Sequence, residues 1–253
     1  MTSATIAAII PARYASTRFP GKPLVKLGGL TMIERVYRQA ARSSLVQSVI
    51  VATDDERIAA TVEAFGGTFA ITRADHASGT DRLAEVARNH PELDIIVNVQ
   101  GDEPLIDPAA IDAAVAPLLS DPAIEMSTLA APLLRQEEAE SPQVVKVVVD
   151  RQGFALYFSR AAIPFYRDNR PFEVRRYLGH VGLYVYRREC LLKLASLTPT
   201  PLEAAESLEQ LRALENGIRI RVMETSYRSL AIDVPEDVEA VEAALAAHRL
   251  REL

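Results

Sequence analysis

Short apolar runs alternate with stretches of helical periodicity along the first 100 residues. Four near-continuous apolar runs are predicted as strands: Ile6–Ile10, Ser48–Ala52, Thr68–Ile71 and Asp94–Val99. Runs without polar alternation are typical of strands that are buried on both faces of a parallel sheet. Apolar residues at helical spacing predict crossover helices between them, at Thr31–Arg42, Asp55–Phe65 and Thr80–Asn89. The alternation predicts an α/β fold with a mostly parallel, twisted sheet flanked by helices.

The pattern is less regular in the second half of the chain. Further strands are predicted at Met126–Ala131, Val144–Val149, Phe154–Phe158, Gly179–Tyr186, Ile218–Met223 and Arg228–Ile232, and helices at Leu202–Leu214 and Pro235–His248. The turn residues Asp150-Arg151-Gln152-Gly153 join two of these strands as a hairpin. Because no repeat and no flexible linker divides the sequence, we expect one domain, residues 1–253, with an embedded hairpin-rich lobe at 133–188.

Composition excludes several classes of protein. Apolar residues make up 49% and charged residues 25% of the 253 positions, as in ordinary globular chains. No stretch approaches the ~18 uncharged apolar residues of a membrane span, and the N-terminal segment lacks the basic region of a signal peptide. The single cysteine, Cys190, excludes an internal disulfide framework and a cysteine-rich zinc site. We therefore expect a cytoplasmic protein, with Cys190 packed in an amphipathic helix.

Charge is distributed unevenly along the chain. The net charge of −6 argues against nucleic-acid binding. Residues 1–33 nevertheless contain four cations and no acid, and residues 151–188 contain eight arginines against two acids. Two basic islands in an acidic protein favour small anionic ligands. For the second island taken alone, ordinary surface scatter is an equal alternative.

The segment that follows the first predicted strand has the composition of a phosphate-binding loop. It reads Pro-Ala-Arg-Tyr-Ala-Ser-Thr-Arg-Phe-Pro-Gly-Lys-Pro from residue 11 to residue 23. Its prolines restrict the backbone, and Gly21 permits close approach to a ligand. Ser16 can donate to phosphate oxygens, while Arg18 and Lys22 supply positive charge. The loop is not a Walker A motif. The alternative is a solvated turn, in which the clustered cations would repel one another.

Two acidic residues are predicted at the edge of the sheet where this loop begins. Asp102 comes just after the strand at Asp94–Val99, and Asp233 comes after the apolar run at Arg228–Ile232. Ligands of open α/β sheets bind at the carboxyl ends of the strands, and magnesium prefers carboxylate, phosphate and water oxygens. The alternatives are a turn residue for Asp102 and a helix N-cap for Asp233.

Three further polar side chains lie on, or directly after, predicted strands in the second half of the chain. Arg160 follows a predicted strand and could hold a carboxylate with two hydrogen bonds. His180 and Tyr184 are four residues apart, which places both on one face of a strand. By themselves, a core histidine and a packed tyrosine are the better interpretation of that pair.

Eight motifs occur in order from about residue 6 to residue 240: IIPARYASTRFPGKPL, VATDDERI, TRADHASGTDRLAEV, IIVNVQGDEPLI, ALYFSRAAIPF, GHVGLYVYRR, LEQLRALENG and AIDVPED. Together they resemble the 3-deoxy-manno-octulosonate (KDO) cytidylyltransferases, which are nucleotidyltransferases with a GT-A-like sheet. The pattern PARxxSxRxPGK also marks the enzymes that activate sialic acid. The combination of NVQGDEP, ALYFSR and LEQLR makes the resemblance specific.

The resemblance implies the reaction of CTP with KDO to give CMP-KDO and pyrophosphate, with magnesium, for lipopolysaccharide biosynthesis. It implies a homodimer with the middle hairpin region at the contact. The nucleotide-binding residues it implies are Arg13, Ser16, Arg18, Lys22, Thr72, Arg73, Ser78 and Gly79. The sugar-binding residues it implies are Gln100, Arg160, His180, Tyr184, Glu209 and Gln210. Asp102 and Asp233 match the metal carboxylates and, with Lys22 and Arg18, make the expected catalytic set.

The chain departs from the family pattern in two places. Residues 164–178 are fewer and richer in arginine than usual, which affects the segment expected to cover the sugar. Gly28-Gly29-Leu30-Thr31 replaces the usual G-[KR]-P before the first helix, which is expected to change a turn rather than the chemistry.

Three alternatives to a KDO enzyme remain open. The nearest is a cytidylyltransferase for another acidic sugar, sialic acid or an 8-amino KDO analogue. A GT-A glycosyltransferase is disfavoured because Asp102-Glu103 lacks the spacing of a DxD metal motif. A nucleotide-binding or regulatory module is disfavoured because Lys22, Asp102 and Asp233 are all present.

Overall fold

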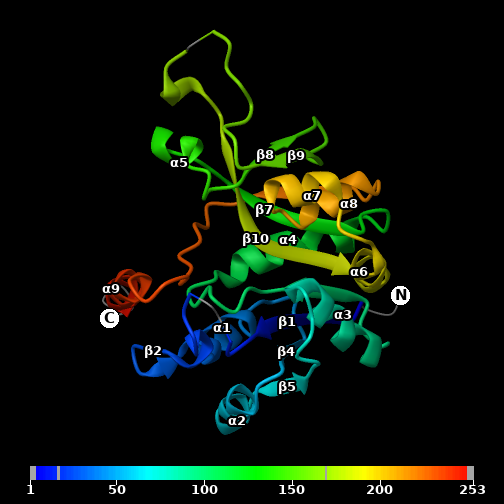
Figure 1. Cartoon of the computed structure of the whole chain (residues 1–253), viewed down its shortest axis with the longest axis vertical. Helices are drawn as coiled ribbons and strands as arrows, with labels where there is room; N and C mark the ends of the chain where they lie inside the picture. Colours follow the sequence, from blue (N-terminus) through cyan, green and yellow to red (C-terminus); the bar gives the residue numbers. More distant parts are fainter. Residues whose placement is uncertain (1–3, 16–17, 169, 250–253) are drawn as a thin grey trace. The chain divides into compact units, whose positions relative to one another are not determined.

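The computed structural model describes residues 4–15, 18–168 and 170–249. The chain divides into two compact units, one formed by residues 1–112 with 229–253 and the other by residues 113–228 (Figure 1). The lobe predicted at 133–188 falls within the second unit. Within the described ranges, no helix combines the length and the apolar character that a bilayer crossing requires.

The first unit is built on four parallel strands in the order β6–β1–β4–β5. Their bounds are Ile6–Ala12 for β1, Ser48–Thr53 for β4, Thr68–Ile71 for β5 and Ile95–Asn98 for β6. Ile6 to Ile10 of the central strand β1 are at most 2% exposed, as expected for a strand covered on both faces. The register places Ile9 opposite both Ile50 and Asn98, so the carboxyl ends of β1, β4 and β6 lie at one edge. The predicted parallel α/β sheet is confirmed.

Three helices of this unit begin where the sequence supplies a capping side chain. They are α1 (Met32–Ala40), α2 (Glu56–Ala64) and α3 (Gly79–Asn89). Asp55 accepts from the Arg57 amide ahead of α2, and Ser78 and Asp81 form a capping box at α3. Gly66, with φ of 76°, follows the end of α2 and donates to the carbonyl of Glu63. All three predicted helices are confirmed to within two residues.

The Gly28-Gly29 departure builds a small hairpin that the sequence pattern did not indicate. The strands β2 (Lys26–Leu27) and β3 (Leu30–Thr31) pair across this two-residue turn, after the single-turn 3-10 helix η1 (Lys22–Leu24). Both glycines have positive φ, 53° and 91°, as a type I′ turn requires. The hairpin buries Leu27 in a cluster with Met32, Ile232, Val241 and Leu245, which anchors the last helix, α9 (Asp237–Arg249), to the unit.

The structure differs from the sequence-based predictions for several elements of residues 101–250. The strand predicted at Arg228–Ile232 is wrong, because this run joins no ladder and Ile232 is buried from irregular backbone. The following helix starts at Asp237 rather than Pro235. Helix α4 (Pro108–Ser120), which carries the chain from one unit into the next, was not predicted. The helix was missed because its alanine-rich sequence shows no clear alternation of apolar and polar faces, and because it contains Pro117.

The second unit is a mixed sheet with the end of α4, four further helices in its described residues and a long excursion. Its strands are β7 (Met126–Pro132), β8 (Lys146–Val149), β9 (Ala155–Ser159), β10 (Leu178–Arg187) and β11 (Ile220–Glu224). β7 pairs with β10 in antiparallel and with β11 in parallel fashion, and β8 joins β10 and β9. The helices are α5 (Gln136–Glu140), α6 (Arg188–Ser196), α7 (Pro201–Glu206) and α8 (Gln210–Glu215). The excursion after β9 carries the 3-10 helix η2 (Phe172–Val174), as Figure 1 shows in yellow-green.

Three details of this unit bear on the predictions. The hairpin turn between β8 and β9 is confirmed, with Gly153 at φ of 78° and the Asp150 amide bonded to the Phe154 carbonyl. The single helix predicted at Leu202–Leu214 is wrong, because Ser207 at φ of 52° ends α7 before α8 begins. Cys190 is buried in α6, as predicted.

Candidate active site

The loop that follows β1 is closed on itself by a short backbone contact. The Gly21 amide donates to the Tyr14 carbonyl at 2.9 Å. Gly21 has φ of 73°, and a Cβ atom there would lie 3.2 Å from the Tyr14 ring. A side chain at this position would therefore be strained by both conformation and space. Ser16, predicted to bind phosphate, lies outside the described residues.

The four predicted catalytic side chains meet at the carboxyl end of the first unit's sheet. The Lys22 Nζ atom lies 2.9 Å from Asp102 Oδ2 and 3.7 Å from Asp233 Oδ1, and it donates to the Ile232 carbonyl at 2.8 Å. Arg18 Nη1 pairs with Asp233 Oδ2 at 3.1 Å. The side chains of Lys22, Asp102 and Asp233 are 15%, 28% and 50% exposed, so the cluster is open to solvent on one side. Lys22 is 80 residues before Asp102, and Asp102 is 131 residues before Asp233, yet all three side chains lie in one charged cluster.

Backbone contacts fix this convergence. The Ile232 amide donates to the Asp102 carbonyl at 3.0 Å and joins the C-terminal segment to the turn after β6. Gly101 makes that turn possible, because a Cβ atom there would lie 2.9 Å from the Pro11 carbonyl oxygen. The amides of Asp233 and Val234 donate to the Asp237 carboxylate, which holds the pKa of Asp237 below its usual range. In the described contacts, the Asp233 carboxylate faces Arg18 and Lys22 rather than an amide of α9.

A second group of predicted nucleotide residues surrounds the start of α3. Arg13 Nη2 donates to the carbonyls of His76 and Ser78 and so ties the loop after β1 to the turn before α3. Ser78 is the N-cap of α3, and Gly79 is the first residue of that helix. The structure therefore joins Arg13, Ser78 and Gly79 into one surface of the first unit.

The segment between β5 and this turn is held by α3. The buried Thr72 hydroxyl accepts from the Arg82 guanidinium. Arg73 is an exposed side chain paired with Asp75, and its amide donates to Glu85 of α3 at 3.1 Å. The predicted nucleotide role of Arg73 stays a prediction, because its guanidinium is engaged with a neighbouring carboxylate here.

Gln100 lies two residues beyond β6, and its side-chain amide donates to the Asn98 carboxamide at 3.3 Å. It belongs to the first unit, whereas the other five residues predicted to bind the sugar belong to the second. Its predicted contact with the sugar stays a prediction.

His180 and Tyr184 of the second unit lie side by side because β10 is irregular between them. Four residues of regular strand would separate their Cα atoms by about 13 Å, yet their ring centroids are 5.2 Å apart. The ladder with β7 runs from Val181 directly to Tyr184, with Gly182 and Leu183 left out of register. Regular alternation predicted the shared face correctly, and the bulge brings the two rings into contact.

The protonation of these two rings follows from their surroundings. Burial lowers the pKa of His180 to about 4, so its imidazole is neutral at pH 7. The His180 Nε2 atom is 2.9 Å from the Thr128 hydroxyl, which in turn donates to the Leu183 carbonyl at 2.7 Å. Nε2 therefore carries the ring proton, and Nδ1 is an acceptor. Burial and the nearby Glu209 carboxylate raise the pKa of Tyr184 well above its usual value.

Arg160 is more fully engaged than the sequence suggested. Its guanidinium donates to three backbone carbonyls, those of Glu206 at 2.8 Å, Pro142 at 3.0 Å and Ser207 at 3.4 Å. Glu209 and Gln210 lie at the start of α8, next to this turn, and Gln210 is buried. The structure thus groups Arg160 with the turn that presents Glu209 and Gln210.

Three charged residues with defined roles in this geometry were missed from the sequence. Lys146 and Arg82 have no exposed surface, and Glu206 accepts two hydrogen bonds from the end of β9. Lys146 could have been found, because it interrupts the run of valines in the predicted strand at Val144–Val149. Desolvation lowers the pKa of Arg82, and within the described residues its Nε and Nη2 atoms have no hydrogen-bond partner.

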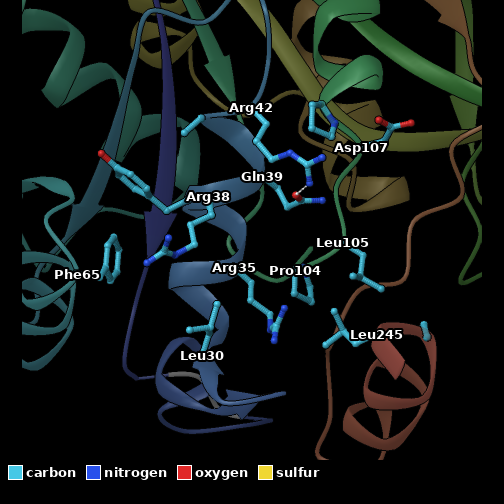
Figure 2. Close-up of a pocket in the computed structure, with 14 residues that line it drawn as sticks. Leu30, Arg35, Arg38, Gln39, Arg42, Phe65, Pro104, Leu105, Asp107 and Leu245 are labelled. Atoms are coloured by element: carbon cyan, nitrogen blue, oxygen red, sulfur yellow. Dashed lines mark hydrogen bonds between the residues drawn. The ribbon is translucent and has the colours of Figure 1, made fainter. Parts of the chain in front are cut away.

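The first unit also contains a groove of about 960 Å³ beside α1 (Figure 2). Leu105 and Leu245 contribute apolar surface to it, and Arg42 donates to Gln39 at 2.9 Å within it. None of the residues predicted for substrate or metal binding lines this groove. The charged cluster around Lys22, rather than this groove, is therefore the candidate active site.

The cluster does not form a complete metal site from protein ligands. In the ranges that the structure describes, no group of three or more His, Cys, Asp or Glu residues is arranged to hold a metal ion. Two carboxylates that converge on one ammonium group do fit a magnesium ion, because this ion is held in many enzymes by one or two carboxylates together with substrate phosphates.

Comparisons with known proteins agree on one family. A family model described as cytidylyltransferase matches residues 7–220. A relative from Syntrophotalea carbinolica, named 3-deoxy-manno-octulosonate cytidylyltransferase, is 58% identical over 95% of this chain and 98% of its own. The protein of the same name from Geobacter metallireducens is 57% identical over 93% of this chain and 96% of its own.

A solved structure of CMP:2-keto-3-deoxy-manno-octonic acid synthetase complexed with CTP has a TM-score of 0.92 and 44% identity. The match covers 97% of this chain and 100% of that one. Since both the family model and relatives at more than half identity span nearly the whole sequence, the chain belongs to the cytidylyltransferase family, among the 3-deoxy-manno-octulosonate cytidylyltransferases.

Proposed function

We propose that this protein catalyses the magnesium-dependent reaction of CTP with KDO to give CMP-KDO and pyrophosphate. The observation that carries the proposal is the convergence of Lys22, Asp102 and Asp233 at the carboxyl edge of a parallel sheet. The relatives' names and the CTP complex of the related synthetase support the two substrates. CMP-KDO formed in this way serves lipopolysaccharide biosynthesis.

The first unit is proposed to bind CTP. Arg18 and Lys22, on the closed loop after β1, bind the triphosphate, because they bring two positive charges to a backbone that Gly21 keeps compact. Ser16 belongs to the same proposed contact. Ser78 and Gly79 open α3 toward the base and ribose, where amides at a helix start act as donors.

The metal is proposed to bind Asp102 and Asp233. Their carboxylates already share a cation, the Lys22 ammonium, and their exposed side leaves room for further oxygen ligands. When bound there, magnesium would neutralise phosphate charge and act as a Lewis acid.

Charge neutralisation is the main contribution of the protein to the proposed reaction. The anomeric hydroxyl of KDO attacks the α-phosphorus of CTP in line with the departing pyrophosphate. An acidic sugar and a triphosphate repel each other, so fixed positive charge at the phosphates lowers the barrier. Lys22 and Arg18 stabilise the charge that develops on the leaving pyrophosphate.

The second unit is proposed to recognise the sugar. The two N–H groups of Arg160 that do not contact backbone carbonyls would bind the KDO carboxylate. The neutral His180 presents an acceptor at Nδ1 to a sugar hydroxyl, and Tyr184 presents a phenol that stays protonated. Glu209 and Gln210 complete the set.

We also propose that the enzyme is a cytoplasmic homodimer whose contact lies within residues 133–188. Four of the seven large apolar side chains that are exposed in the described ranges belong to this segment: Leu134, Leu156, Phe165 and Val174. Exposed apolar side chains gathered in one segment are typical of association surfaces. The buried thiol of Cys190, without a disulfide partner, suits a reducing compartment. Light scattering of the wild type and of Phe165→Asp tests the dimer, because a monomeric wild type would contradict it.

The experiment that tests the activity is pyrophosphate release from CTP. The purified protein is assayed with CTP, magnesium and KDO, and with sialic acid or 8-amino KDO in place of KDO. We expect release with KDO and none when magnesium is chelated. Faster release with another acidic sugar would assign that sugar instead, and no release with any of them would refute the proposed function.

A further inference from the structure

The carboxylate of Glu206, at the last position of α7, holds the end of β9. Its Oε1 atom accepts from the Ser159 hydroxyl at 2.6 Å, and its Oε2 atom accepts from the Arg160 amide at 2.9 Å. Burial alone would raise the pKa of Glu206, but these hydrogen bonds and the charge of Arg160 outweigh it and lower that pKa. Glu206 is therefore a carboxylate at neutral pH, with both oxygens engaged.

Lys146 holds the carbonyl of Arg160, the residue whose amide is bound by Glu206. Its side chain lies in β8 with no exposed surface. The Nζ atom donates to the carbonyls of Ser141 at 2.7 Å, Val144 at 2.7 Å and Arg160 at 2.5 Å. The three protons of the ammonium group are thus used on three backbone oxygens, and both peptide groups of Arg160 are fixed.

The Arg160 side chain extends this arrangement to the sugar-binding turn. Its three bonds reach Pro142, which lies in the loop held by Lys146, and Glu206 and Ser207, which end α7. Ser207 adopts φ of 52° directly before the segment that carries Glu209 and Gln210. Arginine has five N–H donors, so these described bonds leave one on each terminal nitrogen.

Burying the ammonium group of Lys146 between two loops costs desolvation free energy. Desolvation lowers the pKa of Lys146, opposed by the nearby Glu206 carboxylate. An apolar side chain of the same volume often serves stability as well as a buried charge does. Unlike an apolar side chain, the ammonium group fixes the positions of three carbonyl oxygens through directional hydrogen bonds. This argues for a role in the geometry of Arg160 rather than in packing alone.

We propose that Lys146 and Glu206 are positioning residues for sugar recognition, which hold Arg160 and the turn before Glu209 and Gln210 in the geometry that binds the acidic sugar. The inference rests on the proposed function, since it assumes that Arg160 contacts the sugar carboxylate. Neither residue is proposed to touch the sugar or the nucleotide. Their loss should therefore weaken the binding of KDO and leave that of CTP unchanged.

The test compares Glu206→Gln with a matched control in the same helix, Glu203→Gln. Glu203 is also a partly buried carboxylate of α7. It accepts a hydrogen bond of 2.8 Å from the Nε atom of Arg212 in α8, and it has no described contact with Arg160. KM for KDO, KM for CTP, kcat and the melting temperature are measured for both variants. We expect Glu206→Gln to raise KM for KDO about tenfold, with KM for CTP within about twofold of wild type. Glu203→Gln should lower the melting temperature without this split.

Unchanged KM values in Glu206→Gln, or an equal rise in both, would overturn the proposal. If that variant does not fold, Ser159→Ala decides, because it removes the hydrogen bond of the Ser159 hydroxyl to Glu206 without changing a charge. A rise in KM for KDO alone supports the role, and no change contradicts it. Lys146→Met should give the same split, together with a lower melting temperature.

Arg160→Ala separates this inference from the proposed function. If Arg160→Ala leaves KM for KDO unchanged, the proposed contact between Arg160 and the sugar fails, and the inference fails with it. If Arg160→Ala raises KM for KDO while Glu206→Gln and Lys146→Met do not, the sugar contact stands and the positioning role alone is refuted.

Discussion

Replacing Asp102 by asparagine removes one negative charge from the cluster around Lys22 and changes the volume of the side chain very little. The Asp102 carbonyl would still accept from the Ile232 amide, so the turn after β6 keeps its backbone contact. The lost interaction is the ion pair between Asp102 Oδ2 and Lys22 Nζ at 2.9 Å. Because both side chains keep some contact with solvent, we expect a loss of about 1 kcal/mol in the free energy of unfolding.

The expected loss of activity is much larger. If Asp102 binds the proposed magnesium ion, Asp102→Asn should lower turnover at least ~10²-fold, which is roughly 3 kcal/mol in the activation free energy. Domains of this kind are stable by several kcal/mol, so a loss of about 1 kcal/mol leaves nearly all molecules folded. The two effects are therefore separable in one set of measurements.

The assay is pyrophosphate release under saturating CTP and KDO, with magnesium titrated, alongside urea unfolding of the same preparations. Asp107→Asn is the matched control, because Asp107 lies in the same segment, where its carboxylate accepts from the Ala109 amide at 2.9 Å. That variant should keep normal turnover. Near-normal turnover of Asp102→Asn at saturating magnesium would refute the assigned role.

Three further variants test other parts of the structure. Gly101→Ala places a Cβ atom 2.9 Å from the Pro11 carbonyl oxygen and should lower the free energy of unfolding by about 1–3 kcal/mol; an unchanged urea midpoint would show that the close approach is not required. Arg160→Lys should raise KM for KDO far more than KM for CTP, because lysine cannot reproduce the planar fork of donors, and an equal change in both would remove Arg160 from the sugar site. The pKa of His180 is about 4 in the folded protein and about 6.5 in the unfolded chain, so the unfolded state binds more protons between these values and stability falls as the pH drops from 6.5 toward 4. His180→Gln should remove about 2 kcal/mol of that pH dependence, measured as the difference between urea unfolding at pH 7 and at pH 5; a slope identical to wild type would show that His180 is accessible to protons when folded.

The accuracy of the sequence-based predictions depended on whether local pattern or a distant partner decided the structure. The strands β1, β4 and β5 were predicted closely because their near-continuous apolar runs, alternating with helical periodicity, are typical of a parallel sheet, in which each strand finds a neighbour. The run at Arg228–Ile232 has three apolar residues in five and forms no strand, because no described neighbouring edge completes a ladder with it. A strand is a property of a pair, and one segment does not contain that information.

The same distinction holds for side chains. The residue types at Lys22, Asp102 and Asp233 indicated a triphosphate and a metal, and the parallel sheet indicated that they would share an edge. The bulge that brings His180 against Tyr184 and the three carbonyls that occupy Arg160 had no counterpart in sequence spacing. Lys146 and Glu206 were missed because their partners are backbone oxygens and amides, which every residue carries and which no sequence motif marks.

The sequence by itself therefore determined the class of fold, the family and the kinds of charge present, because these follow from periodicity, composition and motifs along one stretch of chain. The tertiary structure decided which charges are paired, which are buried and which carbonyls they hold. Those properties arise only when segments far apart in the chain pack together and exclude water. Each polar group buried in this way then needs a hydrogen-bond partner from the protein.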